Sequence, residues 1–198
     1  MKKFLALGLA LSAAVATPAF AGTTIFTGNT TGGPIFNRPL ANGNNAPTAL
    51  SGVGTTVRYT VTPFTVSISG NYSFNSVAAD PANYDNYLGV HRISFNPASP
   101  LVNAIAYNDD FTGGIGTSGF TALALLAGVS YFAINTGFDT TDFGAYALTI
   151  SGPGNIVGAG GGPAGVPEPA TWAMLIFGFA GIGAALRRRR AGPVAVTA

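Results

Sequence analysis

The sequence has no cysteine, one histidine and very little charge. Of its 198 residues, only 8% are Asp, Glu, Lys or Arg, about a third of the usual share. The absence of cysteine excludes disulfide bonds and thiolate metal ligands. The small amount of charge, with many Gly, Pro, Thr and Asn residues, is typical of β-strands joined by turns.

The formal net charge of +2 describes the two ends of the chain and not its middle. Lys2 and Lys3 begin the chain, and four arginines lie near its C-terminus. The middle has a net charge of −4, from three arginines and all seven acidic residues: Arg38, Arg58, Arg92, Asp80, Asp85, Asp109, Asp110, Asp139, Asp142 and Glu168. It therefore has no basic patch, and we expect no nucleic-acid partner.

The first 21 residues have the parts of a secretory signal peptide. Lys2 and Lys3 form the positive region, and residues 4–15 form the apolar region. Ala19 and Ala21 fit the small-x-small pattern that signal peptidase reads. We expect cleavage before Gly22; the alternative is a buried N-terminal helix.

A second set of signals lies near the C-terminus. A Gly-rich stretch at 153–166 predicts a flexible linker, and Pro167-Glu168-Pro169 follows it. The apolar run at 170–186, which contains Trp172, would form a helix about 25 Å long, at the short limit for spanning a hydrocarbon core about 30 Å thick. The cluster Arg187, Arg188, Arg189 and Arg190 would stay on the cytoplasmic side.

This C-terminal segment resembles the PEP-CTERM sorting signal of Gram-negative bacteria in its PEPxxWA form. The residues that match are Pro167, Glu168, Pro169, Trp172, Ala173, Met174 and the four arginines. The resemblance implies cleavage by an exosortase near the Pro-Glu-Pro box, a transient inner-membrane tether, and association with the cell surface and exopolysaccharide or biofilm matrix. One departure is the eight residues that follow the arginines.

The body of the chain alternates polar and apolar residues with a period of two, which indicates strands. Turn-forming residues separate about eight candidates, and Gly70-Asn71 predicts a hairpin turn. This spacing predicts an all-β fold, an antiparallel β-sandwich or jelly roll, in which each sheet has one buried and one wet face. The predicted strands are 55–61, 64–68, 72–74, 87–95, 101–107, 120–126, 129–135 and 145–150, with one more near 23–26.

The predicted organisation has six parts. They are a signal peptide at 1–21, an irregular segment at 22–52, the β-sandwich at 53–152, a linker at 153–166, the sorting signal at 167–190 with a transmembrane helix at 170–186, and a cytoplasmic tail at 191–198. The order of motifs over 55–152 resembles the bacterial pre-peptidase C-terminal type of jelly-roll domain. That resemblance implies a non-catalytic sandwich that binds calcium or a polymeric substrate in some members.

Acidic and amide side chains in two loops form a candidate calcium site. Asp85, Asn108, Asp109 and Asp110 offer the oxygen ligands that calcium takes in flexible loops. Adjacent like charges in a nearly uncharged protein are explained by a bound cation. The alternative is that these residues cap turns without any metal.

Other candidate residues point to carbohydrate chemistry. Tyr84, Tyr87, Tyr107 and Phe111 flank the acidic loops and would stack on sugars if exposed; otherwise they belong to the core. Asp139 and Asp142 are either turn residues or a carboxylate pair for glycoside cleavage. His91 is either a half-exposed strand residue or a functional one, a general base or a single metal ligand.

Three hypotheses follow. The first is a non-catalytic surface or matrix protein, the second a calcium-stabilised carbohydrate-binding module, and the third a polysaccharide hydrolase.

Overall fold

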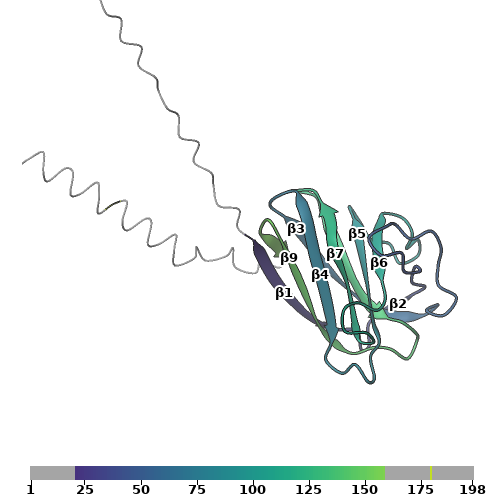
Figure 1. Ribbon diagram of the computed structural model, residues 1–198. Coiled ribbons are helices and arrows are strands. Elements are labelled where there is room, and N and C mark those ends of the chain that lie inside the picture. Colours follow the sequence, from purple (N-terminus) through teal and green to yellow (C-terminus); the bar gives the residue numbers. More distant parts are fainter. Residues whose placement is uncertain (1–20, 159–178, 180–198) are drawn as a thin grey trace, which may run out of the picture. The chain divides into compact units, whose positions relative to one another are not determined.

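The computed structural model describes residues 21–158 and residue 179. The signal peptide up to residue 20, most of the linker and the sorting signal, apart from residue 179, lie outside the described residues. Within those residues the fold is all-β, with two antiparallel sheets (Figure 1). The strands are β1 (Gly22–Asn29), β2 (Ile35–Phe36), β3 (Val57–Val66), β4 (Gly70–Ala78), β5 (Asn86–Arg92), β6 (Ala104–Asn108), β7 (Thr117–Leu125), β8 (Tyr131–Gly137), β9 (Ala145–Gly152) and β10 (Ile156–Gly158).

The chain passes repeatedly from one sheet to the other. One sheet has the order β1-β9-β4-β7, and the other has the order β10-β3-β8-β5-β6 with β2 paired to β3. Only the β2–β3 and β5–β6 connections stay within one sheet. The remaining loops cross between the sheets, and so they gather at the two ends of the molecule.

The predicted strands are confirmed, with shifts at their ends. Every one of them lies in or overlaps an observed strand, and 55–61 and 64–68 join into the single strand β3. The predicted hairpin turn at Gly70-Asn71 is wrong, because Gly70 begins β4 and pairs with Leu125. The glycine is needed for close packing instead, since a Cβ at this position would lie 2.7 Å from the Pro153 ring.

The segment 22–52 is more ordered than its composition indicates. Its predicted strand near 23–26 extends over the whole of β1, which pairs with β9 from Gly22 to Asn29. The described sheets therefore run from Gly22 to Gly158, beyond the predicted limits of 53 and 152. In β1, Phe26 packs against the core and Ile25 is 63% exposed on the outer face, but the Thr, Gly and Asn residues around them give a weak apolar pattern.

The core lies between the two sheets and contains alternate residues of most strands. In β4 and β9 the buried side chains are Tyr72, Phe74, Tyr146, Leu148 and Ile150. Each buried aliphatic or aromatic side chain contributes roughly 1.5–3 kcal/mol. The four-stranded sheet thus has the predicted buried and wet faces.

The six-stranded sheet departs from that prediction, because β5 and β8 are buried on both faces. A second cluster covers the outer face. In it Phe36 and Tyr59 make edge-to-face contacts with Phe95, with ring centroids 5.7 and 5.3 Å apart. The segment between β2 and β3 also reaches this sheet, where the backbone N–H of Asn42 donates to the Tyr107 carbonyl over 2.9 Å.

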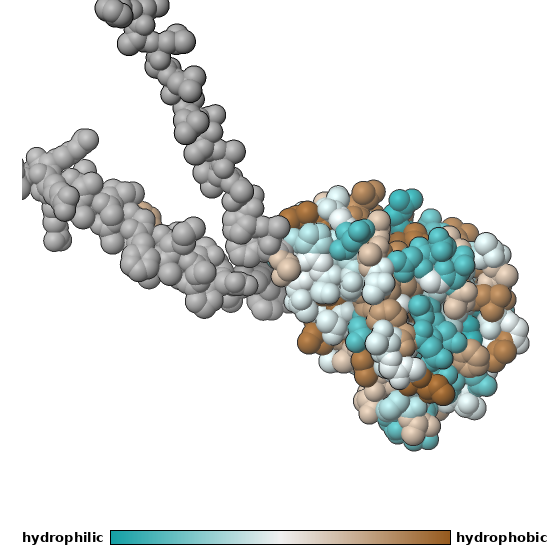
Figure 2. All heavy atoms as spheres, in the orientation of Figure 1, coloured by the Kyte–Doolittle hydropathy of each residue, from teal (hydrophilic) through white to brown (hydrophobic). Residues whose placement is uncertain are grey.

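The outer surface is mixed. On the face that Figure 2 shows, apolar residues lie singly or in small groups among polar ones. Among the described residues no helix has the length and hydropathy required to cross a membrane. The predicted span at 170–186 lies outside the described residues, apart from residue 179.

Candidate metal site

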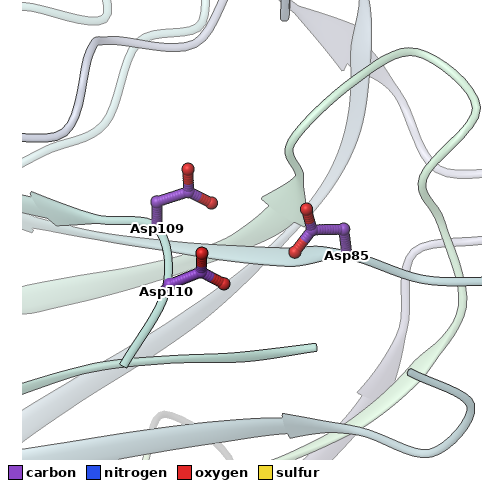
Figure 3. Close-up of side chains that lie close together, drawn as sticks. All are labelled: Asp85, Asp109 and Asp110. Atoms are coloured by element: carbon purple, nitrogen blue, oxygen red, sulfur yellow. The ribbon is translucent and has the colours of Figure 1, made fainter. Parts of the chain in front are cut away.

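Three aspartates from two neighbouring loops converge at one end of the sandwich. Asp85 directly precedes β5, and Asp109 and Asp110 directly follow β6. Because β5 and β6 are antiparallel neighbours, with Leu88 opposite Asn108, the start of one strand lies beside the end of the other. One carboxylate oxygen of each aspartate lies within 4.8 Å of those of the other two. Figure 3 shows the three carboxylates facing a common space.

A glycine-rich turn holds Asp85 in place. The Gly116 amide donates to Asp85 Oδ1 over 3.4 Å, and the Phe138 amide donates to the Asp85 carbonyl over 2.9 Å. Gly116 has a φ of +81°, and a Cβ there would lie 2.4 Å from Pro81. Only glycine fits both requirements, so the turn depends on this residue.

The electrostatics of the cluster disfavour three bare carboxylates. Partial burial raises the pKa of Asp109 to about 6, and the neighbouring charges of Asp85 and Asp110 add to this shift. Burial also raises the pKa of Asp85, although the Gly116 amide opposes the shift. Within the described residues, Asp109 Oδ1 is buried and has no hydrogen-bond partner. A divalent cation would satisfy this oxygen and remove the repulsion.

A buried arginine lies behind the cluster, and its charge lowers the pKa of the acids. Arg38 is 2% exposed. Its Nε and Nη2 donate to the Phe138 carbonyl over 2.9 and 2.7 Å, and its Nη1 donates to the Pro39 carbonyl over 3.3 Å. The guanidinium carbon lies 3.9 Å from the centre of the Tyr87 ring. No carboxylate of the described chain hydrogen-bonds to Arg38, so its charge does not neutralise the aspartates by contact.

The structure therefore brings together three of the four predicted ligands. Asn108 is the last residue of β6 and is partly exposed, directly before Asp109. Calcium takes six to eight oxygen ligands, including backbone carbonyls and water. Three carboxylates supply the charged part of such a shell, and calcium binding itself stays a prediction.

Sequence reasoning missed two contributors to this end of the sandwich. Burial raises the pKa of Asp142, and the charge of Asp142 acts on Asp85 and Asp109. Arg38 gave no sequence signal, because its burial depends on the covering segment between β2 and β3.

The residues predicted to bind or cleave carbohydrate do not lie in the acidic cluster as an accessible sugar site. Tyr84, Tyr87 and Tyr107 are buried in the core, each 1% exposed or less, so these three rings are closed to sugars, and only Phe111 is partly exposed. Asp139 caps its own turn, accepting the Thr141 amide over 2.9 Å.

His91 is fully buried and not half-exposed, because the loop between β5 and β6 covers it. Its Nε2 lies 2.8 Å from the Tyr107 hydroxyl, and its Nδ1 lies 3.2 Å from the Val102 carbonyl. Burial lowers its pKa to about 4. Its strand position, opposite Ala104, is at the far end of β5 from the aspartates. No base-and-carboxylate pair forms between them.

A comparison of stability at two pH values tests the state of Asp109. In calcium-free buffer, Asp109→Asn is expected to be more stable than wild type at pH 7, and this advantage should be clearly smaller at pH 4.5, because it is lost as the pH falls toward the unfolded pKa. The folded pKa of about 6 lies above the unfolded value near 3.9. Folded Asp109 therefore holds a proton in this window that the unfolded chain has lost, so its contribution to stability falls as the pH rises.

The measurement is urea unfolding with EDTA at both pH values. His91, whose pKa is lowered, contributes the opposite slope to both proteins, and only the difference between variant and wild type isolates Asp109. An advantage of equal size at both pH values would contradict the prediction.

The comparison with known families concerns the C-terminus. The PEP-CTERM protein-sorting motif matches residues 165–190, which include the predicted Pro-Glu-Pro box and arginine cluster. No curated protein matches the chain. The described part is thus an all-β domain with a candidate cation site. The motif adds that this is an exported protein sorted to the cell surface by an exosortase.

Proposed function

We propose that the protein is a non-catalytic surface or matrix protein, released from a membrane-tethered precursor and retained with exopolysaccharide. The sorting motif at 165–190, attached to a single described domain of two sheets, is the observation that carries this proposal. Signal peptidase would cut before Gly22, and the exosortase would cut near Pro167–Pro169. The proposed pre-peptidase C-terminal type of jelly roll needs two antiparallel sheets joined by crossing connections, the architecture that the described residues have.

The non-catalytic role is supported by how the polar side chains are used. His91 is buried at the far end of β5 from the acids, Asp139 caps a turn, and Arg38 holds backbone carbonyls. The polysaccharide-hydrolase alternative would need these groups in one accessible site.

The intact mass of the mature protein tests the sorting step. In the native host, the surface form is expected to begin at Gly22 and to lack the residues that follow the Pro-Glu-Pro region. In a strain without the exosortase, the tail should stay attached and the protein should fractionate with the inner membrane. A tail that persists in both strains would show an ordinary membrane anchor and contradict the proposal.

The acidic cluster favours a second candidate function, a calcium-stabilised domain that binds carbohydrate. The three converging carboxylates and the unpartnered Asp109 Oδ1 support the calcium part. The sugar part has less support, because three of the four aromatic candidates are buried. Retention on an affinity gel of the host exopolysaccharide, with calcium or with EDTA, separates this function from a purely structural role.

A further inference from the structure

The two ends of the sandwich differ in charge. All six aspartates of the described domain lie at one end, in loops that follow β4, β6 and β8 or precede β5. The other end has Arg92 as its only charged residue among those described. We name this other end the chain-exit end and define it by the loops at 67–69, 93–94, 101–103, 126–130 and 153–155.

The loops of the chain-exit end form a connected row. Backbone hydrogen bonds join Gly128 to Val66 over 3.1 Å and Ile93 to Ser130 over 2.8 Å. A further bond of 2.9 Å joins Arg92 to Asn103. The row therefore forms one continuous rim across both sheets.

This rim exposes aliphatic side chains at loop tips. Leu126 and Val102 are 53% and 58% exposed, Ile68 is 46% exposed, and Ile93 is 63% exposed. Single exposed aliphatic residues are ordinary on a protein surface. Here four of them lie in adjacent loops that contain no acidic residue.

The backbone conformation of Ile93 lowers the stability of the fold. Its φ is +74°, a left-handed conformation in which a β-branched side chain is strained. Its exposure means that it gains little from burial. Asparagine fits this conformation better, as Asn103 does with a φ of +63° at the other end of the same β5–β6 loop. An exposed, strained isoleucine at this position indicates that the side chain has a function other than stabilising the fold.

The chain enters and leaves the domain near this rim. Gly22 pairs with Gly152, and the Ser67 amide donates to the Asn155 carbonyl over 3.0 Å. Gly158 follows three residues later, and eleven residues separate it from the apolar run that begins at Ala170. A chain of eleven residues spans at most about 40 Å when it is fully extended. A nine-residue strand such as β4 places the acidic end about 30 Å further away.

We propose that the chain-exit end rests on the lipid surface of the membrane that holds the precursor, with Ile68, Ile93, Val102 and Leu126 inserted among the headgroups. This inference rests on the proposed membrane tether. The acid-free rim with Arg92 suits an anionic bilayer, whereas the opposite end would be repelled. The acidic cluster then faces away from the membrane, open to calcium and matrix.

Site-specific fluorescence in reconstituted vesicles tests this docking. Because the chain has no cysteine, the variants Leu126→Cys, Val102→Cys and Ala82→Cys each accept one dye. Ala82 is an exposed residue at the acidic end and serves as the matched control. In full-length protein in phosphatidylcholine/phosphatidylglycerol vesicles, acyl-chain quenchers should act on positions 102 and 126 several times more strongly than on 82, because interfacial side chains reach about 5–10 Å into the headgroup boundary.

The variant Ile93→Asn in the Leu126→Cys background tests the surface without harming the fold. It is expected to unfold at the same or a higher temperature and to reduce lipid quenching at position 126. Equal lipid quenching at positions 126 and 82 would overturn the docking proposal. So would a dye at position 126 that is shielded from aqueous quenchers but not quenched by lipid, because contact with a second copy of the protein would then cover this surface. Vesicle flotation separates failure of the docking proposal from failure of the proposed tether, because a full-length chain that does not float with the vesicles has no membrane tether.

Discussion

Calcium at about 10 mM is expected to raise the melting temperature of this protein by roughly 5–10 °C relative to EDTA. A ligand present at ten to a hundred times its dissociation constant stabilises the folded state by about 1.4–2.7 kcal/mol. Extracellular calcium sites have dissociation constants of about 10⁻⁴–10⁻³ M. The carboxylates of Asp85, Asp109 and Asp110 supply the charge for such a site. Differential scanning calorimetry at pH 7 measures the shift.

Two variants separate a calcium site from a general effect of charge. Asp109→Asn should lose most of the calcium-dependent shift, because it removes one of the three negative charges and leaves a neutral amide in place of a carboxylate. Asp80→Asn removes the same charge from the same end of the sandwich but lies outside the cluster, and it should keep the shift. Equal responses of the two variants, or the same shift with magnesium, would contradict a specific site. Magnesium prefers a smaller octahedral shell and is the matched control ion.

Replacing Arg38 by methionine is expected to lower the free energy of unfolding by about 3–5 kcal/mol, because two backbone carbonyls lose hydrogen bonds from a charged donor, which contribute about 1.5–3 kcal/mol each. The variant would leave the partly buried Phe138 carbonyl without its two donors from Arg38, and the buried Pro39 carbonyl with only the Tyr87 hydroxyl. It would also leave a gap beside the Tyr87 ring. Gly54 packs so closely on Arg38 that a Cβ would lie 2.4 Å from its Nε, so the pocket is shaped for this side chain.

Urea unfolding at pH 7 measures this effect, and Arg58→Met is the matched control. Arg58 is half-buried, donates one hydrogen bond of 3.3 Å to the Gly33 carbonyl and lies 5.3 Å from the centre of the Phe143 ring. Its removal should cost about 1 kcal/mol. Arg38→Lys should be intermediate, because an ammonium keeps the charge without the planar fork. Equal losses for Arg38→Met and Arg58→Met would show that Arg38 has no special role.

Part of the candidate site could be predicted from sequence. The sequence predicted Asp85, Asp109 and Asp110 as metal ligands because carboxylates are rare in this chain and these three lie in predicted loops. Their separation of 24 residues says nothing about distance, however, and only the pairing of β5 with β6 places them within 4.8 Å. Asp142 was named only as a turn residue or a glycosidase carboxylate, and Arg38 gave no signal of its own, because their influence on this site comes from loops that fold over this end.

The sequence by itself determined the features that are encoded locally. A sorting motif is a contiguous string, and the family comparison matched it at residues 165–190. Strand alternation has a period of two and extends over five to ten residues, so the all-β class and nearly all the strands followed from the pattern. The exceptions were the short strands β2 and β10, which no predicted strand covers, and Gly70, which begins a strand where a turn was predicted, because neighbouring chain segments determine these positions.

Tertiary structure alone decided which polar side chains are buried and which loops share an end. Ser76, Asn86 and Asn135 are polar residues that meet between the sheets, with Asn86 Nδ2 donating to Ser76 Oγ over 3.0 Å and Ser76 Oγ donating to Asn135 Oδ1 over 2.7 Å. Tyr84, Tyr87 and Tyr107, which flank the aspartates in sequence, are likewise buried by chain segments that are distant in sequence. Burial, charge segregation and the convergence of the aspartates all depend on pairings between residues distant in sequence, which local patterns do not specify.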